Sequence, residues 1–297
     1  MFQSSSRDNH HKPLEFKSLS ECSVRNLLDK VDILRIAASL KQDQKQKGKL
    51  GQFLTPAPVA ELMAGMFSKL DLPQISLLDA GAGVGSLLAA FVAHLCHSQK
   101  RPANLNIVAY EIDPFLIGYL HQTFKLCAKE CQIAGISFNY EIRHTDFIED
   151  TVRLLQPSLF DNPDNCRFTH AILNPPYLKI NAHSKIRDLL RSIGLETSNL
   201  YTGFIASTVQ LIESRGELVA ISPRSFCNGP YFRDFRRMFL EIMALDQIHL
   251  FESRQQAFID DEVLQETIII HALTKWIEIL KRNKLFLIID NLCKKKR

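Results

Sequence analysis

The sequence predicts an α/β fold with a doubly wound, mostly parallel sheet and an N-terminal helical extension. Three observations lead to this prediction. Short apolar runs alternate with longer segments of helical periodicity between about residues 75 and 272. A glycine-rich turn follows the first apolar run, and Asn174-Pro175-Pro176-Tyr177 follows the fourth. Open sheets of this kind carry their ligand-binding groups on the turns that follow their strands.

The apolar runs place the strands, and the periodic segments place the helices between them. We predict strands at Ile75–Leu78, Leu105–Tyr110, Ser137–Arg143, Thr169–Leu173, Glu217–Ile221, Ile248–Phe251 and Thr267–Ala272. We predict helices over about 87–96, 115–131, 203–214 and 233–244, and an earlier one from about Ser20 to Lys47. Gly48 and Gly51 end this first helix.

Composition restricts the class of protein. The 297 residues suffice for one large or two modest domains, and 46% hydrophobic with 23% charged residues is typical of a soluble globular protein. No apolar run reaches the roughly 18 to 20 residues of a membrane span, and the start lacks a signal core, so we expect a cytoplasmic protein without a membrane partner. The 7 cysteines are scattered, which argues against a metal site. A net charge of +4 permits a polyanionic partner without requiring one.

The turn after the first strand has the composition of a cofactor-binding loop. It runs from Asp79 through Gly81, Gly83 and Gly85, and its glycines allow the backbone to approach a ligand closely. The G-x-G-x-G spacing differs from the G-x-G-x-x-G of dinucleotide folds. Asp79 precedes the glycines, where a cationic sulfonium amino acid could sit. On this turn alone, a nicotinamide site and a methyl-donor site stay equally open.

Acidic residues after the next two strands favour the methyl donor. Glu111 ends the second strand, and a carboxylate there can accept hydrogen bonds from both hydroxyls of a ribose. Asp146 and Phe147 follow the third strand and offer a carboxylate for an adenine amine beside a ring for its face. Each acid could instead be a helix cap or a solvated turn residue.

The tetrapeptide from Asn174 to Tyr177 has the groups that hold a planar amine. Two consecutive prolines fix an extended turn and remove two backbone donors. The Asn amide and the neighbouring carbonyls can then accept hydrogen bonds from a substrate amine, and the Tyr ring offers a stacking face. An ordinary rigid turn is the alternative interpretation.

Together with the early block Gly51-Gln52-Phe53-Leu54-Thr55-Pro56, these motifs resemble the gamma-group N6-adenine DNA methyltransferases of restriction–modification systems, in particular the BsuBI/PstI-type modification enzymes. The resemblance covers about residues 48 to 272, and the Phe-x-Thr-Pro block stands first, as in that group. It implies a Rossmann-like class I methyltransferase fold with S-adenosyl-L-methionine as cofactor and no metal. It also implies double-stranded DNA as partner, with an associated restriction endonuclease as a further possible partner.

The resemblance also implies the roles of individual residues. For the cofactor, Thr55 would lie near the methionine end, Asp79 would face the methionine amine through the glycine turn, and the remaining contacts would come from Phe53, Gly81, Gly83, Gly85, Glu111, Ile112, Asp146 and Phe147. Asn174 and the Pro175 carbonyl would hold the target adenine amine, with Pro176 completing the turn. Tyr177 and Phe258 would stack on the flipped base, and Phe204 would wall the pocket, although core packing is an alternative for both phenylalanines. Direct attack on the sulfonium methyl would follow.

A basic segment and the C-terminus complete the analysis. Between Ser222 and Arg237, arginines alternate with aromatic residues, which fits either a DNA-facing loop or a solvated helix face. We divide the chain into a polar N-terminus with a helix (1–47), a catalytic domain (48–273) and a basic tail (274–297) in place of the family's target-recognition domain. A truncated product and a separate recognition subunit both stay open. So do a non-catalytic DNA-binding fragment and an amino-methyltransferase acting on a protein glutamine or on RNA.

Overall fold

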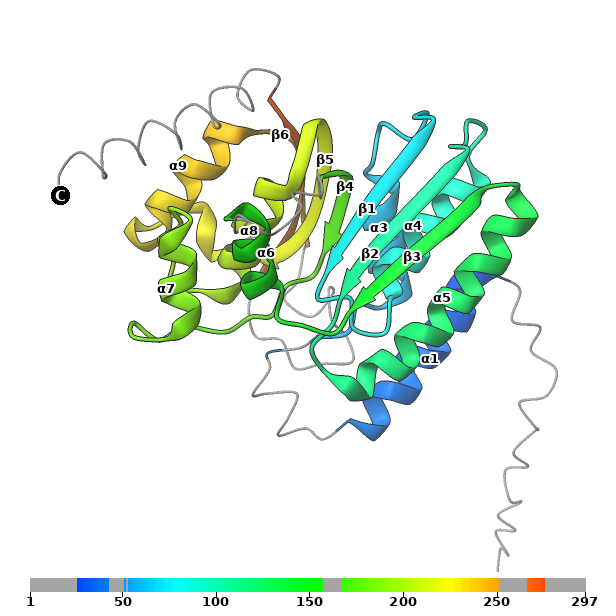
Figure 1. Cartoon of the computed structure of the whole chain (residues 1–297), viewed down its shortest axis with the longest axis horizontal. Coiled ribbons are helices and arrows are strands. Elements are labelled where there is room, and N and C mark those ends of the chain that lie inside the picture. Colours follow the sequence, from blue (N-terminus) through cyan, green and yellow to red (C-terminus); the bar gives the residue numbers. More distant parts are fainter. Residues whose placement is uncertain (1–25, 43–50, 52, 157–166, 252–265, 276–297) are drawn as a thin grey trace, which may run out of the picture.

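In the computed structural model, one mixed sheet organises the chain (Figure 1). The structure describes residues 26–42, 51, 53–156, 167–251 and 266–275. The sheet has 7 strands in the order β3-β2-β1-β4-β5-β7-β6. The strands are β1 (Gln74–Ala80), β2 (Asn104–Tyr110), β3 (Ser137–Arg143), β4 (Phe168–Leu173), β5 (Ile212–Pro223), β6 (Met243–Leu250) and β7 (Thr267–Thr274). The predicted doubly wound, mostly parallel sheet is confirmed.

Only β7 runs against its neighbours. The pairs from β3 through β5 are all parallel, whereas β7 is antiparallel to both β5 and β6. Strand order therefore reverses beside β1, where β2 and β4 flank it on either side. The carboxyl ends of β1, β2 and β4 lie at this switch point, which is where open sheets bind ligands.

Helices cover both faces of the sheet (Figure 1). One layer contains α1 (Leu27–Lys41), α3 (Ala57–Gly65), α4 (Ser86–His97) and α5 (Pro114–Ala134). The other contains α6 (Phe147–Leu155), α7 (Lys185–Ser192), α8 (Leu200–Leu211) and α9 (Arg233–Ile242). Two short 3-10 turns, η1 (Arg224–Cys227) and η2 (Pro230–Phe232), lead into α9.

The central strands are buried on both faces. In β1, Leu77 packs into the core beneath α4 and α5, and the adjacent Leu78 packs into the core beneath α6 and α8. Successive side chains of a strand point to opposite faces, so a parallel strand with helices on both sides is apolar throughout. Burial of each such leucine side chain stabilises the fold by about 1.5–3 kcal/mol. Leu27 and Val31 place α1 in the first of these cores.

Three differences from the sequence prediction have local causes. Residues 212–214 belong to β5 and not to a helix, because Ile212 is extended and pairs with Phe168. The helix α6 was not predicted, although Asp146 begins it by accepting hydrogen bonds from the backbone N–H groups of Ile148 and Glu149. The short helices α3 and α7 were also missed, since one or two turns give little periodic signal.

A buried ionic network ties the antiparallel strands to the layer above them. The Glu217 carboxylate accepts hydrogen bonds from the N–H and hydroxyl of Ser68 at 2.8 and 2.6 Å, and it lies 3.2 Å from His271 Nε2. His271 Nδ1 lies 3.0 Å from Asp246 on β6. Although burial opposes it, the contacts with His271 and Ser68 lower the pKa of Glu217 to about 2. The network therefore stabilises the ionised carboxylate.

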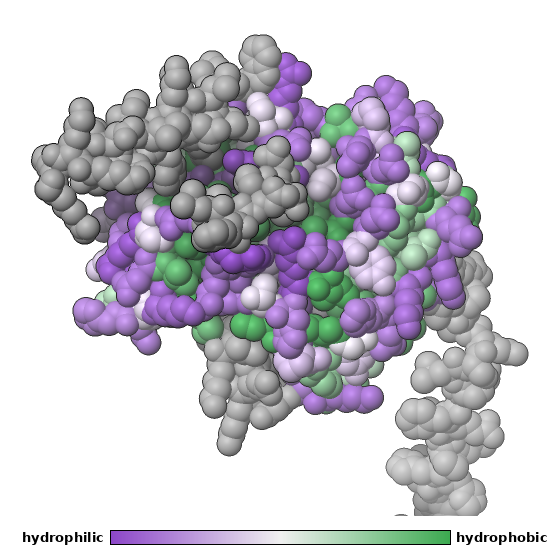
Figure 2. All heavy atoms as spheres, viewed as in Figure 1, coloured by the Kyte–Doolittle hydropathy of each residue, from purple (hydrophilic) through white to green (hydrophobic). Residues whose placement is uncertain are grey.

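The surface in Figure 2 is mostly hydrophilic, with smaller apolar areas between the polar ones. The edge strand β6 exposes Leu245, Ile248 and Leu250. Within the described ranges, no helix is both long and apolar enough to cross a membrane. The same ranges contain no cluster of His, Cys, Asp and Glu that could hold a metal ion.

Candidate active site

A cavity of about 310 Å³ lies at the switch point of the sheet. The segment before α3, the turn after β1, the ends of β2 and β4 and the start of α6 all contribute to its lining. The sequence-predicted residues that line it are Phe53, Thr55, Gly81, Gly83, Glu111, Ile112, Asp146, Phe147, Asn174, Pro176 and Phe204. The fold thus gathers most of the predicted site around one cavity.

Four of the predicted residues that the structure describes do not line this cavity. Asp79 is fully buried and does not line the cavity, and Gly85 and Pro175 are also absent from its walls. Tyr177 lines a second, adjoining cavity. Phe258 lies outside the described residues.

The glycine turn after β1 is shaped by its backbone. Gly81, Gly83 and Gly85 have φ angles of +83°, +59° and +88°, in the left-handed region that favours glycine. The N–H groups of Gly81 and Ala82 donate to the carbonyl of Tyr110 at 3.0 and 2.8 Å, which fixes the turn to the end of β2. A Cβ atom on Gly85 would lie 2.9 Å from both Leu120 and Thr123. Gly85 is therefore required for packing against α5.

The carboxylate of Glu111 is held against this turn. It accepts hydrogen bonds from the N–H of Gly83 at 2.7 Å and from the N–H of Asp113 at 2.8 Å. Burial raises the pKa of Glu111, and the two N–H donors oppose the rise. Because each carboxylate oxygen can accept more than one hydrogen bond, the group remains suited to hydroxyl donors from the cavity.

Asp146 combines the two roles considered for it. Its Oδ1 caps α6 by accepting from the N–H groups of Ile148 and Glu149 at 2.8 and 3.0 Å. The residue also lines the cavity, so the same carboxylate both caps α6 and borders the site. Phe147 beside it packs edge-on against Tyr110, with ring centroids 4.9 Å apart, and against Phe204 at 5.2 Å. These rings form one apolar wall.

Asp79 is the most strongly perturbed acid of the site. Neither carboxylate oxygen has a hydrogen-bond partner among the residues that the structure describes. Burial and, to a smaller extent, the charge of Glu111 raise the pKa of Asp79 to about 8. The nearby backbone N–H of Leu88 offsets the rise only in part. Without a bound cation, Asp79 is therefore largely protonated at neutral pH.

The amide of Asn174 is held in one orientation. Its Nδ2 donates to the carbonyl of Phe53 at 2.8 Å and to Thr55 Oγ1 at 3.1 Å. A carbonyl oxygen can only accept, so the side-chain NH2 must face Phe53. Asn174 Oδ1 is buried and has no hydrogen-bond partner in the described part of the chain. The fixed amide thus leaves one buried acceptor on a residue that lines the cavity.

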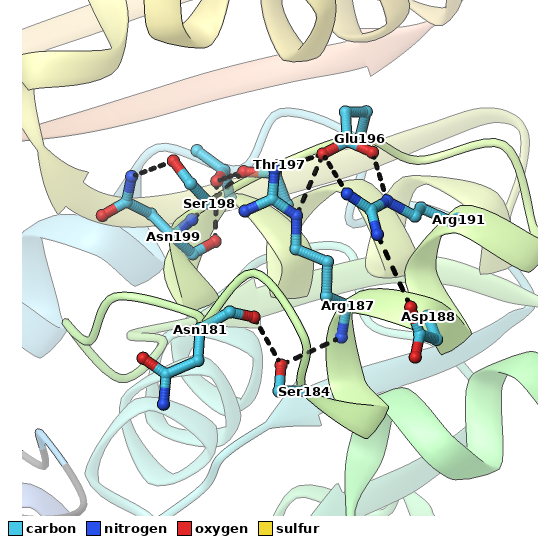
Figure 3. Close-up of polar contacts among 10 residues, drawn as sticks. Asn181, Ser184, Arg187, Asp188, Arg191, Glu196, Thr197, Ser198 and Asn199 are labelled. Carbon is cyan, nitrogen blue, oxygen red and sulfur yellow. Dashed lines mark hydrogen bonds and ion pairs between the residues drawn. The ribbon is translucent and has the colours of Figure 1, made fainter.

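The chain that follows Tyr177 is fixed by a small polar cluster (Figure 3). Lys179 forms a β-bridge with Asn199, and the N–H of Ile180 donates to the carbonyl of Ser198 at 2.8 Å. Arg187 and Arg191 of α7 both pair with Glu196. Backbone contacts therefore join the two ends of the segment between residues 178 and 200, and the two Arg–Glu pairs hold α7 to the chain that follows it.

A second cavity of about 1040 Å³ adjoins the first, and Leu178 lines both. Its walls combine aromatic rings with basic and small polar side chains. They include Tyr177, Lys179, Tyr201, Arg224, Ser225, Asn228, Tyr231 and Phe232. Aromatic faces with cations at the rim are the groups that bind unstacked nucleotides.

The arginines between Ser222 and Arg237 have different roles. Arg236 donates to the carbonyls of Phe226, Asn228 and Gly229 at 2.9, 3.1 and 2.8 Å, so it holds the loop internally. Arg237 pairs with Glu241 on the same helix, as in a solvated helix face. Arg224, in contrast, lines the second cavity, where it pairs with Glu266 at 3.3 Å.

Sequence reasoning missed part of the lining. The additional residues are Leu54, Ala82, Val84, Ser86, Leu87, Tyr110, Leu116, Thr145, Leu178, Ile186 and Leu200. Most are apolar and come from elements whose apposition depends on the tertiary fold. Ser86 could have been predicted from the sequence, since it directly follows the glycine turn at the start of α4. In the structure its buried hydroxyl has no hydrogen-bond partner among the described residues.

Comparisons with known proteins show the family to which the chain belongs. The family model described as Eco57I restriction-modification methylase matches residues 107–258. The chain is 47% identical over 247 residues to the type II methyltransferase M.BsuBI of Bacillus subtilis, covering 83% of this chain and 48% of that protein. It is 44% identical over 245 residues to the type II methyltransferase M.PstI of Providencia stuartii, covering 82% and 47%. The chain spans about half the length of these relatives.

A solved structure shows the same fold at low sequence identity. It is described as a class I S-adenosylmethionine-dependent methyltransferase from Listeria monocytogenes, with a TM-score of 0.60 and 12% identity. The match covers 86% of this chain and 70% of that one. The Rossmann-like class I methyltransferase fold implied by the sequence motifs is therefore confirmed.

Proposed function

Because the chain belongs to the Eco57I restriction-modification methylase family, we propose that it transfers the methyl group of S-adenosylmethionine to the N6 amino group of adenine in DNA. One observation carries the proposal. Asn174 lines the cavity at the end of β4, its Nδ2 is bound, and its buried Oδ1 has no hydrogen-bond partner among the described residues. A neutral acceptor with no internal partner is what an incoming amine donor requires.

The first cavity is the site that we propose for the cofactor. Its volume of about 310 Å³ lies at the lower end of the range of about 300–1,000 Å³ for small-molecule sites. Glu111 and Asp146 both line this cavity, and we assign the ribose hydroxyls to Glu111 and the adenine amine of the cofactor to Asp146. Phe147 and Phe204 supply apolar surface for the purine. Buried Asp79 supplies a negative charge behind the turn when a cationic ligand drives off its proton.

When bound, S-adenosylmethionine supplies an electrophilic methyl group on a sulfonium. The chain's own contribution is to position the nucleophile and to stabilise the charge that develops on it. The adenine amine is conjugated with its ring and is a poor nucleophile. Acceptors at Asn174 Oδ1 and at the Pro175 carbonyl would draw both amine protons toward the enzyme and favour a tetrahedral nitrogen with an available lone pair.

The second cavity would receive the target base. An adenine in duplex DNA must leave the stack to reach the cavity, at a cost of a few kcal/mol. Stacking on an aromatic ring is worth about 1–3 kcal/mol, which Tyr177 could supply from the wall of the second cavity. Lys179 and Arg224 at the same cavity would contact phosphate. We propose that a further domain or a separate subunit selects the sequence, within a system that includes an endonuclease.

A pair of asparagine variants tests the proposal. Calorimetric titration with S-adenosylmethionine and tritiated methyl transfer to adenine-rich duplex DNA are measured for wild type, Asn174→Ala and Asn181→Ala. We expect Asn174→Ala to lose transfer by at least about 100-fold, as for loss of an oxyanion-hole donor, while cofactor affinity changes little. Asn181 is exposed, so Asn181→Ala is the matched control. Equal loss of binding and transfer in Asn174→Ala would remove the role assigned to Asn174.

A further inference from the structure

We propose that Phe53 and Thr55 position Asn174 for methyl transfer, with Thr55 acting through the Asn174 amide. This inference rests on the proposed function, and it differs from the expectation that Thr55 serves the cofactor's methionine end. The side chain of Thr55 is buried, and its hydroxyl lies 3.1 Å from Asn174 Nδ2.

The two anchors have separate effects on the amide. The Phe53 carbonyl sets its direction, because rotating the amide by a half turn would bring Asn174 Oδ1 against another acceptor. The Thr55 hydroxyl can donate or accept, so it holds the amide in place without choosing its direction. With both anchors engaged, Oδ1 is the only oxygen of the side chain and it faces away from them.

A backbone contact ties the same segment to the other end of the turn. The N–H of Tyr177 donates to the carbonyl of Gly51 at 3.1 Å. Gly51 has a φ of +59°, and a Cβ atom there would lie 2.7 Å from Leu178 Cγ and 3.1 Å from the Tyr177 nitrogen. The segment from Gly51 to Thr55 therefore holds Asn174 by its side chain and Tyr177 by its backbone.

Thr55→Val and Thr55→Ser distinguish positioning from cofactor binding. Valine keeps the shape of threonine and removes the hydroxyl, whereas serine keeps the hydroxyl. If Thr55 acts through Asn174, Thr55→Val should slow single-turnover transfer about tenfold, with the dissociation constant of S-adenosylmethionine changed less than about twofold. Thr55→Ser should restore most of the rate. A Thr55→Val variant that binds the cofactor weakly but transfers at the wild-type rate when saturated would overturn the proposal.

A spectroscopic measurement tests the contact without requiring activity. With selective ¹⁵N-asparagine labelling, the side-chain NH2 signals of Asn174 are assigned by their loss in Asn174→Ala. We expect these protons to exchange slowly in the wild type, and at least about tenfold faster in Thr55→Val. Unchanged shifts and exchange would overturn the proposal. Failure of the wild type to methylate DNA would instead contradict the proposed function, and the amide signals would still report the contact.

Asn174→Asp tests the direction set by the Phe53 carbonyl. An ionised carboxylate would place an oxygen against that carbonyl, whereas a protonated acid can donate to it and leave its C=O as the acceptor. The transfer rate relative to wild type should therefore fall at least about 100-fold near pH 8 and recover as the pH is lowered. The other polar side chains that line this cavity are identical in the variant and the wild type, so the ratio of the two rates removes any pH dependence that they share. A ratio independent of pH would contradict the assigned orientation.

Discussion

Replacing Asp79 with asparagine should stabilise the unliganded protein, although Asp79 directly precedes the glycine turn that we propose binds the cofactor. Its pKa rises from 3.8 to about 8 because the carboxyl is buried, with Glu111 adding to the rise. Between these two values the folded chain holds a proton that the unfolded chain has released. Stability therefore falls as the pH rises from about 4 to about 8, and it levels off above that.

The magnitude follows from the size of the shift. One pKa unit corresponds to 1.36 kcal/mol, so the raised pKa of the carboxyl lowers the free energy of unfolding by about 4 kcal/mol at pH 7. Asparagine removes this cost, but its buried amide lacks partners at a site where both oxygens of Asp79 lack them among the described residues. Leaving such groups unsatisfied costs about 1–3 kcal/mol. We therefore expect Asp79→Asn to gain about 1–3 kcal/mol at pH 7.

Urea unfolding at about pH 5, 7 and 9 measures the effect. The difference between Asp79→Asn and wild type should grow with pH up to about 8, by no more than about 1.4 kcal/mol per pH unit. Asp113→Asn is the matched control, because the buried Asp113 accepts from Phe115 N and Gln42 Nε2 at 2.9 and 3.3 Å. The Asp113→Asn variant should lose about 1 kcal/mol of its free energy of unfolding. A pH-independent difference, or loss of stability in Asp79→Asn, would refute the reasoning. The same variant should bind S-adenosylmethionine more weakly.

Three other perturbations have defined outcomes. Glu217→Gln should lower the free energy of unfolding at pH 7 by about 3 kcal/mol. The lowered pKa of Glu217, about 2, gives stability that is lost as the pH falls from about 4.5 to 2, so the variant should lose less stability over this range. The same acid dependence of stability in the variant and the wild type would contradict this. Arg236→Ala should lower the free energy of unfolding in denaturant by about 2 kcal/mol, whereas Arg237→Ala should lower it by less than about 0.5 kcal/mol. Equal effects would exclude the role of Arg236 in holding the loop. Gly51→Ala should reduce methyl transfer and thermal stability together, because alanine disfavours the positive φ of this residue and its Cβ would clash with Leu178. Wild-type values for both properties would be incompatible with the described turn.

The central strands β1, β4 and β5 could be predicted well because they are apolar and largely buried. The runs predicted at Leu105–Tyr110 and Ser137–Arg143 match β2 and β3 to within one residue. The direction of β7 could not be predicted, since an apolar run has the same composition in either direction. The short helices α3 and α7 escaped detection because each spans only about two turns.

The site was predictable to the extent that its residues follow strands. Glu111, Asp146 and Asn174 all stand just past strand ends, and the parallel sheet brings these ends together. The contact of Thr55 with Asn174 joins residues far apart in the sequence, and no periodicity encodes it. The burial of Asp79 likewise depends on the packing around β1, which the local motif does not specify.

The identity of the methylated nucleoside tests the central proposal most directly. Duplex DNA containing all four bases is incubated with the chain and S-adenosylmethionine, digested to nucleosides and resolved by mass spectrometry against methylated standards. The account predicts N6-methyladenine as the product, absent when Asn174→Ala replaces the wild type. A methyl group on cytosine, or no methylated nucleoside from a chain that binds the cofactor, would contradict it.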